Sequence, residues 1–184
     1  MNAIATQDKQ AASPEQGQYL TFMLSGEVFA IGILSIKEII EYGDPTTVPM
    51  MPESIRGVIN LRGAVVPVID LSARFGRRPA QTTRRTCIVI IEVQGDDGRQ
   101  VVGVIVDAVN AVLEIAAADI EPTPSFGSGI RTDFIRGMGK IDNRFVIVLN
   151  VDKVLSAADL ALPEDFGQMA EAAAGESRAQ PQEA

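Results

Sequence analysis

Few residues in this chain could carry out chemistry. Its 184 residues include no histidine and one cysteine, Cys87. The lack of histidine removes the commonest general base and metal ligand, together with every Ser–His or Cys–His nucleophile pair. Cys87 lies in an apolar run and has no second cysteine, so nothing is expected to lower the pKa of its thiol. We predict that Cys87 fills space in a strand.

Two acids form the best candidate pair for acid–base catalysis. Asp70 and Asp107 each end an apolar run that is expected to be a strand. A carboxylate-dependent hydrolase built on them would need an interior acid with a raised pKa, and a capping or surface role is the alternative. Asp96 and Asp97 lie between glycines but supply too few oxygen ligands for calcium, so a solvated turn is predicted there.

The glycine-rich and basic segments match nucleotide or nucleic-acid sites poorly. At 136–140, Arg-Gly-Met-Gly-Lys, one residue separates the glycines, whereas a Walker loop has four. Arginines at 74, 77, 78, 84 and 85 have a single aromatic residue, Phe75, among them. The net charge of −8 also opposes binding to phosphate backbones. A solvated linker or a contact with an acidic partner is favoured, and an oligonucleotide-binding barrel is the alternative, with steep salt dependence.

Two other features suit contact with a protein partner. The segment Leu-Arg-Gly-Ala at 61–64 places the permanently charged Arg62 at the tip of a tight turn, where glycine allows a positive φ. The segment Pro-Met-Met-Pro at 49–52 is a stiff loop that carries two adaptable apolar side chains. The residues alone leave a solvated turn residue and a core-filling loop as alternatives.

Short strands are expected to position these residues. Runs of β-branched residues separated by turn residues are typical of an all-β sandwich or barrel. About nine or ten strands are expected, too many for one small barrel and suited to two five-stranded ones. A strand is expected at 109–115, and hairpins are predicted at 19–25 with 28–31, 58–61 with 65–69, 86–93 with 100–106, and 134–141 with 144–149.

Helical periodicity is brief and predicts three short helices. The first depends on the spacing of the isoleucines at 33, 36 and 40, which would share one helix face. The second begins with a proline and ends before a glycine. Their expected bounds are 34–42, 52–56 and 151–158.

The ends of the chain are expected to lie outside the fold. Residues 1–17 are small and polar and predict a flexible lead-in. Residues 164–184 have five acids and one arginine and predict a disordered acidic tail, which leaves a folded part at 18–163. No apolar run approaches the length of a membrane span and the start lacks the features of an export signal, so a cytoplasmic protein is predicted.

Six segments of the folded part, taken in order, carry a family resemblance. The most specific combination is Asn-Leu-Arg-Gly at 60–63 followed by Val-Pro-Val-Ile-Asp-Leu at 66–71. The full set is 19–22, 32–39, 55–63, 66–71, 101–107 and 134–139, which runs from residue 18 to about 160. This order resembles the family of the chemotaxis coupling protein CheW.

The resemblance implies two packed, five-stranded SH3-like β-barrels with a few short helices. It also implies a non-enzymatic adaptor that couples methyl-accepting chemoreceptors, through their cytoplasmic tips, to the histidine kinase CheA. Binding the receptor and binding the kinase need no cofactor, nucleic acid or direct membrane insertion. The partners would bring the protein to receptor arrays on the inner face of the membrane. An adaptor of a related pathway, for pili or another output, is the alternative within this class.

Three sets of residues follow from the resemblance. The receptor-binding groove would include Ile33, Glu38, Ile39, Arg62, Cys87, Val102 and Gly103. The kinase would contact Tyr42, Asp44, Thr46, Val48, Arg56 and Gly57. A second kinase-facing patch, used to close rings in arrays, would include Glu121, Ser125 and Phe126, with Phe126 as its apolar anchor. The family often has a basic residue where Glu121 stands.

Overall fold

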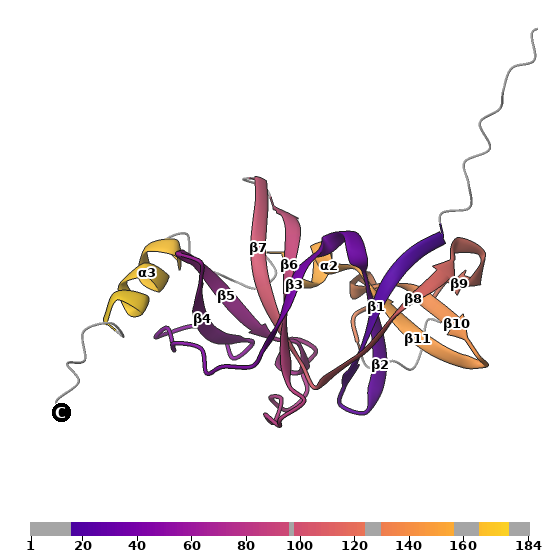
Figure 1. Cartoon of the computed structure of the whole chain (residues 1–184), viewed down its shortest axis with the longest axis horizontal. Helices are drawn as coiled ribbons and strands as arrows, with labels where there is room; N and C mark the ends of the chain where they lie inside the picture. The colour runs from indigo at the N-terminus through magenta and orange to yellow at the C-terminus, as the bar shows by residue number, and fades with distance from the viewer. Residues whose placement is uncertain (1–15, 96–97, 124–129, 157–165, 177–184) are drawn as a thin grey trace, which may run out of the picture.

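The structure, a computed structural model, describes residues 16–95, 98–123, 130–156 and 166–176. Strands dominate these residues, which confirms the all-β class. The strands form two sheets. Figure 1 shows them as two neighbouring lobes, with β1 on one side of the molecule and the C-terminal helix on the other.

The first sheet contains the first and last strands of the chain. Its strands are Gln16–Leu24 (β1), Glu27–Gly32 (β2), Ala108–Ala116 (β8), Ile120–Glu121 (β9), Ile135–Ile141 (β10) and Arg144–Leu149 (β11). Their order is β8-β1-β2-β11-β10-β9, and β11 runs parallel to β2. The sheet has one strand more than the expected five because the two-residue β9 pairs with β10.

The second sheet is made by the middle of the chain. Its strands are Ile36–Glu41 (β3), Ile55–Leu61 (β4), Ala64–Asp70 (β5), Cys87–Gly95 (β6) and Gly98–Val106 (β7). Their order is β3-β6-β7-β5-β4, with β5 parallel to β7. The edge strand β4 also pairs with the segment after β3, through Thr46 and Val58, whose two N–O distances are 2.8 and 2.9 Å. This bridge joins the two edges, as closure of a sheet into a barrel requires.

The two sheets share one central core. Phe22 and Phe29 of the first sheet stack with ring centroids 6.0 Å apart, and Phe29 stacks on Phe75 at 5.7 Å. Phe75 follows the short helix Leu71–Arg74 (α1), which continues from β5. Its ring lies 6.2 Å from that of Phe134, which precedes β10. Large buried rings of both lobes therefore hold the sheets together.

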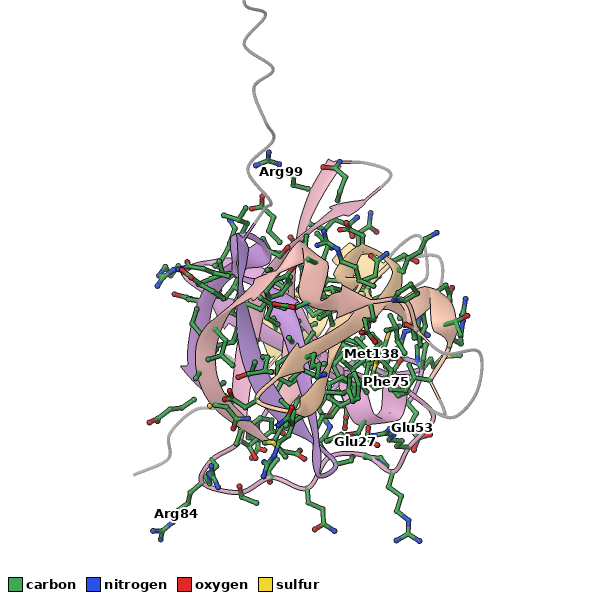
Figure 2. All side chains as sticks on the ribbon, turned by 90° about the vertical axis from the view of Figure 1, so that its right-hand side faces the viewer. Glu27, Glu53, Phe75, Arg84, Arg99 and Met138 are labelled. Atoms are coloured by element: carbon green, nitrogen blue, oxygen red, sulfur yellow. The ribbon has the colours of Figure 1, made fainter. Side chains whose placement is uncertain are left out.

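Each sheet also encloses a smaller apolar cluster. The first is built on Tyr19, Ala30, Ile115, Val146 and Val148, and the second on Val68, Ile88, Ile90 and Ile105. In Figure 2, Phe75 and Met138 of the central core lie inside the molecule, while Arg84 and Arg99 project from opposite ends. These two arginines thus lie on the outside of the molecule.

The helix expected at 34–42 is absent, and most of this segment is a strand, so that prediction is wrong. Ile33–Ser35 make one 3-10 turn (η1), and β3 follows. Ile36 packs against the central core, whereas Ile40 packs against the cluster of the second sheet. Along β3, partly buried positions alternate with exposed ones, and a register shift between Ile36 and Glu38 lets Ile36 and Ile40 face different clusters. The isoleucine spacing then imitates a helix.

The other two predicted helices have different outcomes. Residues 52–56 are not helical: the Ile55 N–H donates to the Pro52 carbonyl at 2.9 Å, and this turn leads directly into β4. The helix expected at 151–158 is present as Val151–Val154 (α2). Further 3-10 turns are Ala117–Asp119 (η2) and Thr132–Phe134 (η3).

The C-terminal segment differs from the expected disordered tail. Phe166–Glu176 form a helix (α3), and Ala170 on it is buried. At the other end β1 begins at Gln16, and most of the predicted lead-in lies outside the described residues. Within the described ranges, no helix has the length and apolar character needed to cross a membrane.

Candidate functional site

Arg62 is held at the tip of the β4–β5 hairpin. Arg62 and Gly63 have φ values of 51° and 86°, and the Gly63 N–H donates to Asn60 Oδ1 at 2.9 Å. The predicted positive-φ turn is therefore confirmed. Arg62 Nη2 donates to Glu38 Oε2 of β3 at 2.7 Å. Since β3 and β4 are the edges of the second sheet, this ion pair spans the gap between them.

The Arg62–Glu38 pair is open to solvent on one side. The Arg62 side chain is 77% exposed and that of Glu38 24%. Glu38 Oε1 is buried and accepts no hydrogen bond within the part of the chain that the structure describes. An ion pair this exposed contributes at most about 1 kcal/mol to folding. It is better suited to orienting a charged partner than to holding the barrel together.

The remaining residues expected in the receptor groove do not share one face of the sheet. Glu38 aligns with Ile90 of β6, whereas Ile39 lies on the opposite face because side chains alternate along a strand. Glu41 is on the same face as Ile39 and aligns with Cys87. Ile39 is 43% exposed, so it offers apolar area beside Cys87.

Two of the expected groove residues are inside the fold. Val102 is 4% exposed and belongs to the central core, and Gly103 is buried where a β-carbon would lie 2.8 Å from Ile88 Cγ2. They shape the sheet and present no side chain at the surface. Ile33 lies apart from them, beside the fully exposed Leu34 in a surface cavity of about 770 Å³.

Cys87 has the environment of an unreactive thiol. Burial, followed by the charge of Glu41, raises the pKa of Cys87 from its ordinary value. Its Sγ donates to the Arg85 carbonyl at 3.4 Å. A raised pKa leaves less thiolate at neutral pH, which is the reactive form. The structure therefore supports the space-filling interpretation.

The residues expected to face the kinase gather around the start of β4. Gly57 has a φ of 153°, and a β-carbon there would collide with the Thr46 carbonyl. The glycine thus allows Thr46 to pair with Val58 and close the second sheet. Asp44 is exposed, while Tyr42 is partly buried against the cluster of the second sheet.

Arg56 stabilises the fold rather than standing free. Its Nη2 donates to Asp70 Oδ2 at 2.6 Å and to the Ala80 carbonyl at 3.2 Å. Partial burial opposes its charge, but the hydrogen bond and charge of Asp70 outweigh this and raise the pKa of Arg56. Asp70 is fully buried and also accepts from the N–H groups of Ala80, at 2.9 Å, and Ala73, at 3.2 Å. The Ala73 bond caps α1, so the capping role predicted for Asp70 is present.

Val48 is not exposed at this surface. It is 4% exposed because α3 covers it: Phe166, Met169, Ala170 and Ala173 pack over a patch that contains Val48, Met51, Val58 and Val65. Met50 beside it is 94% exposed and has a φ of 60°. Sequence reasoning missed α3, although the spacing of its apolar residues, i, i+3, i+4 and i+7, is that of an amphipathic helix.

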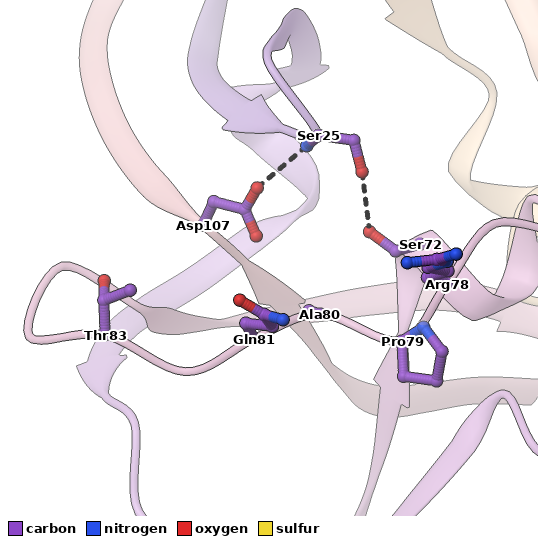
Figure 3. Close-up of a pocket in the computed structure, with 8 residues that line it drawn as sticks. All are labelled: Ser25, Ser72, Arg78, Pro79, Ala80, Gln81, Thr83 and Asp107. Carbon is purple, nitrogen blue, oxygen red and sulfur yellow. Dashed lines mark hydrogen bonds between the residues drawn. The ribbon is translucent and has the colours of Figure 1, made fainter.

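Asp107 lies at a surface cavity between the lobes and does not contact Asp70. Its Oδ2 accepts from the Ser25 N–H at 2.8 Å, and Ser25 Oγ lies 3.3 Å from Ser72 Oγ, as Figure 3 shows. The cavity has a volume of about 370 Å³ and also includes Arg78. Among the described residues, no three His, Cys, Asp or Glu side chains gather as a metal site would need. Both acids are occupied by structural hydrogen bonds, which gives the hydrolase hypothesis no support.

The second kinase-facing patch is only partly visible. Glu121 is exposed in β9 and aligns with Met138. Ser125 and Phe126 lie outside the described residues. A β-carbon at Gly137 would collide with Ile120 and lie 2.9 Å from the Glu121 carbonyl oxygen. The glycine-rich segment is therefore a strand that lets β9 approach closely, and not a phosphate loop.

Comparisons with known proteins agree with this architecture. The CheW-like domain family matches residues 18–159. A chemotaxis protein CheW of Klebsiella aerogenes is 33% identical over 168 residues, which is 91% of this chain and 99% of the relative. The chemotaxis protein CheW of Rhizobium meliloti is 34% identical over 142 residues, covering 77% of this chain and 89% of the relative.

A solved structure has the same fold. The crystal structure of the scaffolding protein TtCheW from Thermoanaerobacter tengcongensis superposes with a TM-score of 0.69 at 34% sequence identity. It covers 78% of this chain, and this chain covers 90% of it. The match extends over both sheets and the family match runs through nearly all of the predicted folded part. The chain belongs to the CheW-like family of chemotaxis scaffold proteins.

Proposed function

We propose that this chain is a non-enzymatic adaptor that couples the cytoplasmic tips of methyl-accepting chemoreceptors to the histidine kinase CheA. The observation that carries the proposal is the Arg62–Glu38 pair, which holds a long cationic side chain, 77% exposed, over the gap between the edges of the second sheet. A fixed charge beside exposed apolar area gives orientation and specificity in protein contacts. The adaptor works in the cytoplasm and reaches receptor arrays through its partners.

The receptor contacts Arg62 and the exposed part of Ile39. Glu38 positions Arg62 through the hydrogen bond to its Oε2. Cys87 adds a small, unreactive surface beside Ile39. Val102 and Gly103 act indirectly, because they set the packing under these residues.

The kinase contacts the start of β4 and the segment between β3 and β4, which contains Asp44, Thr46 and Val48. Arg62 lies just beyond the end of β4, whose seven residues span about 23 Å. A protein contact of ordinary size takes about 800 Å² from each partner, so the two surfaces can be occupied together. Such a double contact is what a coupling protein needs. Glu121 and Phe126 provide the further contact that closes rings in an array.

The test is a titration of the purified protein against CheA, with and without a receptor cytoplasmic fragment, that reads both binding and kinase activity. Arg62→Glu should reduce receptor-dependent activation about tenfold, because it reverses the charge that faces the receptor. Arg99→Glu is the matched control, since Arg99 is 78% exposed and also pairs with an acid of the second sheet. Full activation with Arg62→Glu would contradict the assignment of Arg62.

A charge exchange separates recognition from internal structure. The double variant Arg62→Glu, Glu38→Arg can form the same ion pair with its polarity reversed. If the receptor reads the charge at position 62, activation stays low in the double variant. Recovery of activation would instead mean that the pair acts by holding the two sheet edges, and would remove Arg62 from the receptor contact.

A further inference from the structure

The end of the second sheet that holds Val48 is covered by the chain itself. α3 lies against β4 and β5 at the far end of the molecule from the first sheet, as Figure 1 shows. Val48 and Val58 beneath it are 4% and 1% exposed, and Ala170 of the helix is 1% exposed. The contact therefore removes an apolar patch from solvent, and the patch consists of residues from β4, β5 and the loop before β4.

This patch overlaps the kinase-facing surface of the proposed function, on which the inference rests. Val48 belongs to both. Val58 beneath α3 is the partner of Thr46 and follows Gly57 in β4. A kinase domain that reaches Thr46 and Val48 would meet α3 first. Both cannot occupy the patch at the same time.

α3 has little stability of its own apart from the patch. It has eleven residues, and an isolated helix of that length is marginal in water. Gly167 and Gly175 weaken it further, because glycine lowers helix stability relative to alanine. Two of the four residues on its apolar face are alanines, and the other two, Phe166 and Met169, stay partly exposed. α3 thus depends on the patch for its order, whereas both sheets have cores of their own.

One apolar side chain next to the patch stays uncovered. Met50 is 94% exposed, and its φ of 60° is unusual for a residue with a side chain. It is close in sequence to Val48 and Met51 under α3. A partner could contact Met50 while α3 is still docked and then take over the rest of the patch.

We propose that α3 is a displaceable cap, which occupies the apolar patch in the free protein and is replaced by the kinase on binding. The expected occupant is an apolar surface of the kinase that contacts Met50, Val48 and Val58. The affinity of the free protein is then reduced by the fraction of molecules in which the patch is open. Freeing the patch tightens kinase binding without any change in the receptor contact.

Two glutamate substitutions on α3 test this in the full-length chain. Ala170→Glu places a charge in the buried contact, and Gln168→Glu places the same charge on an exposed position of the same helix. If the cap is open in about one molecule in ten, Ala170→Glu tightens CheA binding about tenfold. Gln168→Glu leaves it unchanged. Equal affinities for wild type, Ala170→Glu and Gln168→Glu would overturn the cap.

Hydrogen exchange on the wild-type protein is a second test that depends on no variant. On binding CheA, the amides of 166–176 should lose protection while those of β4 keep it. Protection of 166–176 that persists in the complex overturns the inference and leaves the proposed function intact. If neither wild type nor variants bind CheA, the proposed function itself fails and the inference fails with it.

Discussion

The hairpin β4–β5 with α1 and the hairpin β10–β11 with α2 are built alike. Each begins with Ile-Arg-Gly, at 55–57 and 135–137, and in each the strand register shifts at the arginine. Both turns have two residues with positive φ, and both hairpins lead into a short helix capped by a side chain. A carbonyl approaches each glycine closely, from Thr46 in one unit and from Glu121 in the other.

The two units differ in the residue that caps the helix. Asp70 carries a negative charge, and Arg56 turns inward to bind it. Asn150 is neutral in the equivalent place, and Arg136 is exposed at the cavity beside Leu34. The same local sequence therefore gives a partly buried structural arginine in one lobe and an exposed arginine in the other. The difference arises from Asp70, the partner of Arg56, which lies fourteen residues later in the chain.

Replacing each arginine by alanine should give the largest contrast. Arg56→Ala leaves the buried Asp70 without its cation and should lower the free energy of unfolding by about 3 kcal/mol. Arg136→Ala removes an exposed side chain and should change it by less than about 0.5 kcal/mol. Urea unfolding followed by circular dichroism measures both. Equal losses would show that Arg136 has a structural partner too.

The glycines should behave alike in the two units. Gly57→Ala and Gly137→Ala force a backbone carbonyl to move, and each should cost about 2 kcal/mol of stability. Gly63→Ala is the control, because no atom lies near its β-position and only the positive φ opposes the change, at about 1 kcal/mol. Thermal melting compares the three. A Gly57→Ala protein as stable as Gly63→Ala would contradict the close approach of Thr46.

Removing the arginine of an exposed ion pair, Arg131–Asp133, should have the smallest effect on the protein. Arg131 Nη2 lies 2.6 Å from Asp133 Oδ2, and this hydrogen bond lowers the pKa of Asp133 from its ordinary value of 3.8. The stabilisation is therefore present above that ordinary value and is lost as the pH falls through the lowered pKa. Arg131→Ala should raise the pKa of Asp133 in an NMR titration. An unchanged titration would mean that the pair does not persist in solution.

Sequence reasoning predicted the hairpins because their signals are local. Turn pairs such as Arg62-Gly63 and Asp142-Asn143 need only their own residues to adopt positive φ, and the flanking β-branched runs need only to alternate. The helix expected at 34–42 failed because β3 forms by pairing with the distant β6, and a register shift in that pairing sends Ile36 and Ile40 to different clusters. α3 was hidden by an acidic, alanine-rich composition that also suits a disordered segment.

The surfaces were predicted less completely than the strands. The resemblance to the CheW family placed Arg62 and Glu38 in one groove, and they do form a pair. It also placed Val102 and Gly103 there, and these are buried. The exposure of a residue depends on what packs over it. Val48 is covered by α3, a helix more than a hundred residues later in the chain.

The order of residues was enough to establish the all-β class, the hairpins and the absence of histidine chemistry, because each depends on composition or on neighbours along the chain. Which side chains meet was decided by the folded structure. Arg56 and Arg136 share one local motif, and only the buried carboxylate of Asp70 draws the first of them inward. A buried charge without a partner is costly, so charged side chains from distant segments pair where the fold buries them.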